Sequence, residues 1–393
     1  MSEAVPGATR GNRVLLVLTG LGALGIATAG FVSLAPNRLI SGRPLALWSA
    51  ADSASFAAIA LLGAVLLAAS LWRQSRAIHA LAALAGLLLL LLVCLTAGRA
   101  AATLAAAAGP VARISLGASF WLLLACTALA IVDAFQRLKA SPTVGIAAAL
   151  LICALIAVMA NAGIFDNLSI MLEYRAHQAA FAHEFGRHLL LVLGSVGAGL
   201  AIGVPLGIRL AERPKAAGPV FATLNLLQTI PSVALFGLLI APLSMLAAAV
   251  PTLKAIGVQG IGMTPALIAL TCYALLPIVR YTHTGVTGVD PGVVEAASGM
   301  GFTRSQILWR IELPLAMPML LAGLRIVLVQ SIGLAVVAAL IGAGGLGTFV
   351  FQGIGQDAVD LVLLGTLPTI FLALATDFGL KTVTSFLQGR LAR

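Results

Sequence analysis

Charged residues are scarce in this 393-residue chain. Asp, Glu, Lys and Arg make up 9% of it, against roughly 25% in a soluble globular domain. A water-soluble fold with so few charges could not cover its own surface, so the composition excludes that class. Hydrophobic residues make up 61% of the sequence. This predicts a polytopic membrane protein whose helices satisfy their own backbone hydrogen bonds.

Cysteine and acidic residues are also few. The four cysteines all lie inside apolar runs without a CxxC pair, so they predict neither a disulfide framework nor a metal site. They are Cys94, Cys126, Cys153 and Cys272. The net charge of +10 comes without any long basic cluster. It therefore indicates basic cytoplasmic loops and not a nucleic-acid surface.

Nucleotide motifs are missing or out of context. No GxxxxGK[ST] sequence occurs, so the chain is not predicted to hydrolyse ATP by that route. Gly342, Gly344 and Gly347 satisfy GxGxxG, but a long apolar run precedes them where a dinucleotide-binding fold needs a strand. We interpret these glycines as a tight turn at a periplasmic helix end.

A histidine cluster raises the question of a metal site. It consists of His177, His183, Glu184 and His188. The spacing is H-E-x-x-x-H, not the H-E-x-x-H that places two histidines one helical turn apart. The sequence therefore favours a solvated external segment here, with no metal bound.

Apolar runs long enough to cross a bilayer recur along the whole chain. We predict ten spans at about 14–35, 52–72, 79–98, 114–133, 143–163, 188–208, 218–245, 263–284, 315–341 and 358–380. The first follows Arg10 and Arg13 and is too long for a signal-peptide core. Pro231 and Pro242 are expected to break the 218–245 run.

The composition changes near residue 165. Earlier spans are rich in Leu and Ala, whereas later ones carry Gly, Pro, Gln, Thr and Ser. We expect accessory helices at 1–165, a periplasmic connector at 166–187 and a working core at 188–385. One ladder in the core repeats every four residues and predicts a helix face for close packing. It is Ser195, Gly199, Gly203 and Gly207.

The basic residues set a predicted orientation. With ten spans and a cytoplasmic N-terminus, most Lys and Arg residues fall in cytoplasmic segments. Both termini are then cytoplasmic, and so is the polar interval Glu295–Pro314.

This interval reads EAASGMGFTRSQILWRIELP. Asp290-Pro291 upstream suits a helix start, Gly301 suits a helix end, and Ser305–Ile311 suits a second short helix before Pro314 opens the next span. We therefore expect two short helices beneath the membrane that form a protrusion to which another protein can bind.

The spacing of this interval resembles the signature loop of permease subunits in bacterial ATP-binding-cassette importers. The matching positions are Glu295, Ala296, Ala297, Gly301, Ile311, Leu313 and Pro314. The resemblance implies an all-α integral membrane protein with a five-helix permease core preceded by about five accessory helices. It also implies that loop 290–314 docks on a separate ATPase, which uses ATP and Mg²⁺. This chain itself would bind no cofactor, carry no catalytic residue and not be an enzyme.

Other stretches resemble the glycine betaine/carnitine/choline permease group. They are residues 228–232 (QTIPS), 273–280 (YALLPIVR), 288–291 (GVDP) and 341–347 (IGAGGLG). The resemblance covers about 188–385, and the extra N-terminal spans are similar to those of longer betaine-importer permeases. It implies a bacterial inner-membrane location and three partners: a cytoplasmic ATPase dimer, a periplasmic solute-binding protein, and a second permease copy or paralogue.

Polar residues at a helix break indicate a cavity lining at membrane depth. The candidates for the translocation pathway are Gln228, Thr229, Pro231, Ser232, Tyr273 and Pro277. Aromatic faces attract a quaternary ammonium, which adds Tyr281 and Phe236, although core packing also explains each aromatic residue. Arg325 and Asp377 are expected to snorkel from helix ends.

Three alternatives remain open. A methionine-type permease shares the loop and the Gly-rich stretch. An ATP-independent secondary transporter would need paired ionisable residues in mid-span. A membrane scaffold would fit the N-terminal half but gives no reason for the loop spacing.

Overall fold

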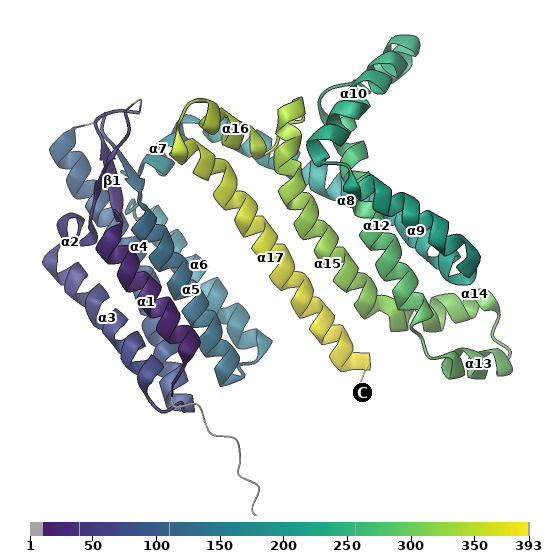
Figure 1. Ribbon diagram of the computed structural model, residues 1–393, viewed down its shortest axis with the longest axis horizontal. Coiled ribbons are helices and arrows are strands. Elements are labelled where there is room, and N and C mark those ends of the chain that lie inside the picture. Colours follow the sequence, from purple (N-terminus) through teal and green to yellow (C-terminus); the bar gives the residue numbers. More distant parts are fainter. Residues whose placement is uncertain (1–10, 39, 110, 256, 392–393) are drawn as a thin grey trace, which may run out of the picture. The chain divides into compact units, whose positions relative to one another are not determined.

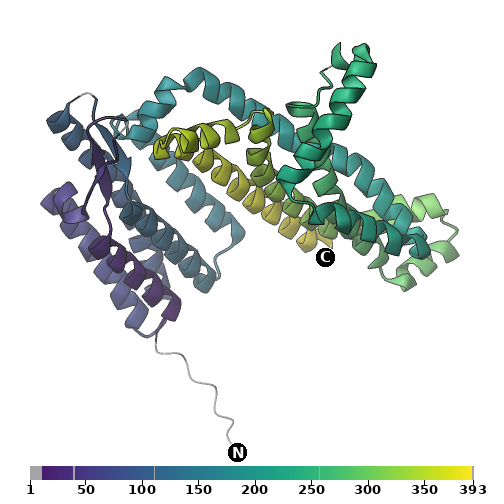
Figure 2. The same cartoon turned by 45° about the horizontal axis from the view of Figure 1, so that its top comes forward.

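The computed structural model describes residues 11–38, 40–109, 111–255 and 257–391. Arg10 and Arg393, which contribute to the charge argument, lie outside these residues. The chain forms two compact units, Met1–Ala176 and His177–Arg393. Figures 1 and 2 show both units from two directions.

Unit 1 is a helical bundle closed at one end by a small sheet (Figure 1). Its helices are α1 (Arg13–Thr28), α2 (Leu47–Ala50), α3 (Ser53–Leu71), α4 (Arg76–Ala108), α5 (Ala118–Leu138), α6 (Pro142–Asn161) and α7 (Ser169–Ala176). Its strands are β1 (Val32–Ala35), β2 (Arg43–Leu45) and β3 (Arg113–Leu116), paired antiparallel in the order β2-β1-β3.

The sequence did not predict this sheet. The apolar run at 14–35 was expected to be helical throughout, but α1 ends at Thr28 and β1 follows. Phe31 and Val32 are fully buried at the sheet, and Val32 pairs with Leu45 and Leu116 from distant parts of the chain. Hydropathy alone cannot distinguish a buried strand from the end of a helix.

The start of α1 is fastened to the end of α5. Asn12 caps α1 by accepting from the Leu15 N–H at 3.2 Å, and its Nδ2 donates to Asp133 at 2.5 Å. Arg137 pairs with the same carboxylate at 2.9 Å. These bonds tie together two helices that are far apart in sequence.

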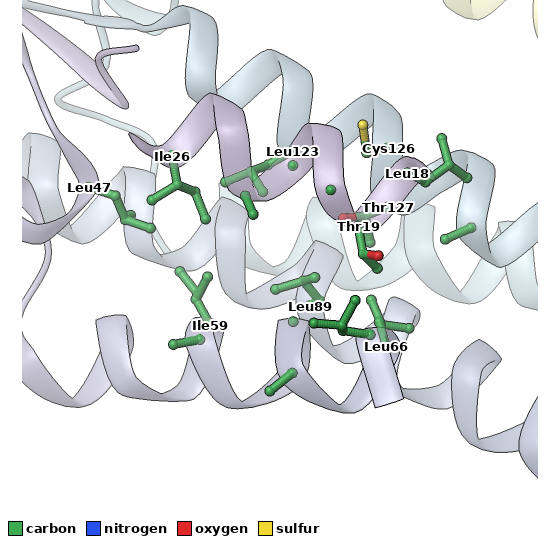
Figure 3. Close-up of a pocket in the computed structure, with 18 of the residues that line it drawn as sticks. Leu18, Thr19, Ile26, Leu47, Ile59, Leu66, Leu89, Leu123, Cys126 and Thr127 are labelled. Atoms are coloured by element: carbon green, nitrogen blue, oxygen red, sulfur yellow. The ribbon is translucent and has the colours of Figure 1, made fainter. Parts of the chain in front are cut away.

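An apolar groove of about 390 Å³ lies between α1, α3 and α5 (Figure 3). Leu18, Ile59 and Leu123 are among its lining side chains, and Thr19 and Thr127 are its hydroxyl groups. The hydroxyl of Thr19 already donates to the Leu15 carbonyl within α1. Its lining contains no charged side chain.

Unit 2 contains the long helices of the second half. They are α8 (Gln178–Glu212), α9 (Pro214–Thr229), α10 (Ser232–Ala249), α12 (Met263–Thr287), α15 (Leu313–Val337) and α17 (Val359–Leu391). Shorter elements are α11 (Pro251–Ala255), α13 (Pro291–Gly299), α14 (Arg304–Ile307), the π-helix η1 (Leu308–Glu312), the 3₁₀-helix η2 (Ala338–Ile341) and α16 (Gly347–Gly355). In both cartoons α13 and α14 lie at one end of this unit and α16 at the other.

Nine helices within the described residues are long and apolar enough to cross a membrane, and α1 is a shorter apolar helix of 16 residues. This confirms the predicted all-α membrane fold. Pro231 separates α9 from α10 as predicted, but Pro242 lies inside α10, so the expected second break is wrong. A proline inside a membrane helix is tolerated because neighbouring helices and local turns satisfy the backbone groups that it leaves unpaired.

The glycine ladder of α8 packs against α12 and confirms the predicted face. A Cβ added at Gly199 would lie 3.0 Å from Ala274, one at Gly203 would lie 2.7 Å from Ile278, and one at Gly207 would lie 2.7 Å from Thr282. Only glycine allows the two helices to approach this closely.

Candidate functional site

The loop helix α13 begins where the sequence placed it. Asp290 Oδ1 accepts from the Gly292 N–H at 2.8 Å, and Pro291 occupies the first turn, where a missing N–H costs nothing. Along the helix, Glu295 and Ala296 are exposed, whereas Ala297 is buried, with 1% of its surface exposed. Glu295 and Ala296 therefore lie on the accessible surface.

Gly301 ends α13 in a Schellman motif. Its φ is +84°, which strains any residue with a Cβ. The Phe302 N–H donates to the Ala297 carbonyl at 3.2 Å, and the Gly301 N–H donates to the Ser298 carbonyl at 3.0 Å. These two bonds satisfy carbonyls that the helix end would leave unpaired. The spacing from E-A-A to Gly301 thus spans the second half of α13 and its cap.

The second half of the loop differs from the prediction. Thr303 and Gln306 form a capping box, with bonds of 3.3 and 2.8 Å, that starts α14. The helix then continues through η1 into α15 without a separate short helix. The π turn bonds the Leu313 N–H to the Leu308 carbonyl just before Pro314, which has no N–H of its own. Ile311 is half-buried, Leu313 is buried and Pro314 is exposed.

Two carboxylates converge on Arg304. Its Nη1 lies 2.6 Å from Glu312 Oε1, and its Nε lies 3.4 Å from Glu212 Oε1. Glu312 is buried, with 5% of its surface exposed, whereas Arg304 and Glu212 are accessible to solvent. Arg304 thereby connects the loop with the last residue of α8 and the residue before α15.

An apolar groove of about 520 Å³, here called the α8–α15 groove, lies beside this ion pair. Its lining is Val204, Pro205, Ile208, Arg209, Trp309, Leu313, Pro314, Met317 and Leu320. Trp309 is 67% exposed even though it lines the groove. The end of α8 is therefore not closely packed on η1 and the start of α15.

The break between α9 and α10 is braced by α12. The Tyr273 hydroxyl donates to the Ile230 carbonyl, and Gln228 Nε2 donates to the Tyr273 carbonyl at 2.8 Å. Tyr273 is 7% exposed. The structure thus brings Gln228 and Tyr273 together with the backbone before Pro231, in an arrangement that satisfies polar groups freed by the helix break.

The remaining pathway candidates are less closely associated. Thr229 is exposed and its hydroxyl donates to the Leu226 carbonyl at 2.7 Å within α9. Ser232 is partly exposed at the start of α10, and Pro277 lies inside α12. None of the six pathway candidates lines either groove described above.

The Gly-rich turn before α16 holds three glycines in the left-handed region, which confirms the predicted tight turn. Gly342, Gly344 and Gly345 have φ values of +77°, +76° and +87°. Glu184 accepts from the Gly345 N–H at 2.5 Å, and His188 is completely buried behind this turn. The prediction of a solvated segment is therefore wrong for His188, because the segment begins α8 and packs on residues 160 positions later.

Arg325 and Asp377 form a contact that the sequence did not predict. Their side chains form an ion pair of 2.9 Å between α15 and α17. Helix-by-helix reasoning could not find this pair, since it depends on which faces of the two helices meet.

Sequence reasoning also missed the roles of Glu184, Glu212, Arg304 and Glu312. The available signal was that charged residues are rare in this chain and that these four lie near helix ends or loops. A charged side chain in so apolar a chain is a candidate for pairing with another charged side chain or with a backbone group.

Comparison with known families follows the division into units. Residues 12–171 match the N-terminal domain of the ABC transporter permease YehY. Residues 203–389 match the binding-protein-dependent transport system inner membrane component family.

The match to this chain covers most of the length of each relative. The osmoprotectant import permease protein OsmW of Salmonella typhimurium is 39% identical over 54% of this chain and 93% of the relative. The carnitine transport permease protein OpuCB of Listeria monocytogenes is 41% identical over 49% and 82%, respectively. The Bacillus subtilis glycine betaine/carnitine/choline permease protein OpuCB is 36% identical over 53% and 90%.

The helical membrane fold and the capped loop thus define a permease subunit of the ATP-binding-cassette importer class. The chain belongs to the binding-protein-dependent transport system inner membrane component family, within a group of osmoprotectant permeases. It is a multi-pass inner-membrane protein, and the resemblance to this group is confirmed.

Proposed function

We propose that this permease imports glycine betaine or a related quaternary-ammonium osmoprotectant. The names of the relatives above support this substrate class. We assign residues 188–385 to the permease core, 166–187 to a periplasmic connector and 1–165 to accessory helices, with both termini in the cytoplasm.

The proposed energy source is a separate cytoplasmic ATPase dimer that uses ATP and Mg²⁺. The loop 290–314 is the docking element. The main support for this assignment is the Schellman motif at Gly301, which fixes the end of α13 and leaves Glu295 and Ala296 exposed. Ala297, Ile311 and Leu313 face inward or partly inward and hold the loop's shape, and Pro314 marks its junction with α15. A periplasmic binding protein delivers solute to two paired permease subunits.

The mechanism is alternating access. ATP closes the ATPase dimer, the docked loops move together, and the pathway opens outward to receive solute. Gln228 and Tyr273 brace the break at Pro231. Thr229, which is exposed, and Ser232, which is partly exposed, would face the solute, and Pro277 lies in the same bracing helix, α12.

The test is uptake into proteoliposomes that contain this chain with the ATPase and binding protein encoded by its neighbouring genes. We expect ATP-dependent uptake of radiolabelled glycine betaine, choline or carnitine. Uptake without the ATPase would establish an ATP-independent transporter instead. Uptake of methionine alone would overturn the substrate class while retaining the importer class.

A further inference from the structure

The coupling loop (residues 290–314) lies between α12 and α15 in the sequence, so the end of α8 is not joined to it directly. Helix α12 ends at Thr287, three residues before the Asp290 cap of α13, and η1 continues directly into α15. A movement of the loop therefore reaches α12 and α15 through the backbone. Helix α8 ends at Glu212 and then turns into α9, so it follows the loop through its packing on α12 and through side-chain contacts at Glu212.

Apolar packing at this point is incomplete. The α8–α15 groove, of about 520 Å³, separates Val204, Pro205 and Ile208 of α8 from Leu313 and Met317 of α15. Close-packed interfaces transmit displacement because their side chains cannot move independently. With this groove in between, the polar contact at Glu212 is the direct link between the end of α8 and the start of α15.

Arg304 supplies that contact. Its Nη1 is held 2.6 Å from the buried carboxylate of Glu312, which fixes the guanidinium against the start of α15. Its Nε is then directed at Glu212, 3.4 Å away on α8. A planar guanidinium can serve two carboxylates at once in a fixed geometry, whereas the single ammonium of lysine cannot reproduce this fork.

We infer that Arg304 is a positioning residue that makes the end of α8 move with the coupling loop. This inference rests on the proposed coupling function of that loop. Helix α8 is a continuous element of 35 residues, and its other end holds the Gly-rich turn through Glu184. Glu184 and Glu212 are about 40 Å apart along the helix at 1.5 Å per residue. Through the Arg304 contact, a movement that the ATPase causes in the loop at one end of α8 is passed to the Gly-rich turn at the other end.

The glycine face of α8 supports this route. Gly199, Gly203 and Gly207 hold α8 against α12 with no room for a Cβ. Because this interface is tightly packed, a displacement of the Glu212 end moves α8 together with the facing part of α12.

The first test uses Glu212→Gln in the full complex with the ATPase and binding protein. This change removes the charge on α8 and leaves the Arg304–Glu312 pair intact. We expect normal assembly and continued ATP hydrolysis, with glycine betaine uptake per ATP reduced roughly fivefold, the lower end of the coupling seen between two sites of allosteric proteins. Lys215→Ala is the matched control, since it removes one exposed charge three residues beyond Glu212 and is expected to leave the ratio unchanged.

The second test is a double-mutant cycle with Arg304→Lys. This variant keeps a cation beside Glu312 but loses the two-sided geometry, so we expect a reduced ratio. The combination Arg304→Lys/Glu212→Gln should be no worse than either single variant, because both remove the same link. Additive losses, or a Glu212→Gln ratio equal to that of the unaltered complex, would overturn the inference.

The two proposals fail differently. If the unaltered complex shows no ATP-dependent uptake, the proposed function is wrong. If it transports normally and the Glu212→Gln complex does so with the same uptake per ATP, only the role of Arg304 is wrong.

Discussion

The carboxylate of Glu184 accepts a hydrogen bond from the backbone N–H of Gly345 at 2.5 Å. Glu184 lies near the start of α8, and Gly345 lies in the turn between η2 and α16. Thr348 Oγ1 lies 3.4 Å from the same carboxylate oxygen. One acidic side chain thus fastens a turn whose glycines adopt left-handed backbone conformations that glycine accepts without strain.

The first prediction concerns this attachment. Glu184→Ala removes the acceptor, and a hydrogen bond to a charged group contributes about 1.5–3 kcal/mol. We expect the Gly345 amide to exchange with deuterium about tenfold faster or more, measured by mass spectrometry of the 342–348 region. Gln178→Ala, an exposed change at the start of α8, is the control and should leave this exchange as it is. Equal rates in the two variants would show that Glu184 does not hold the turn.

The second prediction compares the last residue of α13, Gly299, with the glycine that caps the helix, Gly301. Gly301 has a φ of +84° and Gly299 is helical, and neither has an atom within 4 Å of an added Cβ. Gly301→Ala should therefore cost about 1–2 kcal/mol in backbone strain alone. Gly299→Ala should be neutral or slightly stabilising.

Limited trypsin digestion measures this difference, since cleavage after Arg304 reports how often the loop opens. We expect cleavage to be about tenfold faster in Gly301→Ala, because opening populations follow the free energy when reclosing is fast. Similar cleavage in both variants would mean that the Schellman motif does not stabilise the loop.

The third prediction concerns the interface of α8 with α12. Gly203→Ala would place a Cβ 2.7 Å from Ile278, and overpacking of this kind costs about 1–3 kcal/mol. We expect a lower midpoint of thermal unfolding in detergent. Gly197→Ala on the same helix meets no atom within 4 Å and serves as the control. If both variants unfold at the same temperature, the two helices do not depend on this close approach.

Local rules explain the parts of the fold that sequence reasoning predicted. The start of α13 at Asp290-Pro291 and its end at Gly301 follow from capping chemistry within a few residues. The break at Pro231 has an equally local cause. The glycine ladder was predictable because the period of the α-helix alone puts its members on one face.

Several of the wrong or missing predictions involve partners far apart in sequence. The run at 14–35 was read as one helix, but β1 forms because Val32 meets Leu45 and Leu116. His188 was predicted to lie in a solvated segment, but its side chain is buried against the turn at Gly345, more than 150 residues later in the sequence. No period or propensity in the sequence encodes such a meeting.

The amino-acid sequence by itself determined that this protein lies in a membrane, roughly where most of its long helices lie, and which loop carries the family's spacing. These properties depend on transfer from water and on hydrogen bonds a few residues long. Only the tertiary structure decided which charges are paired: Arg304 with Glu212 and Glu312, and Arg325 with Asp377. An ion pair forms only where helix packing brings two side chains within about 4 Å.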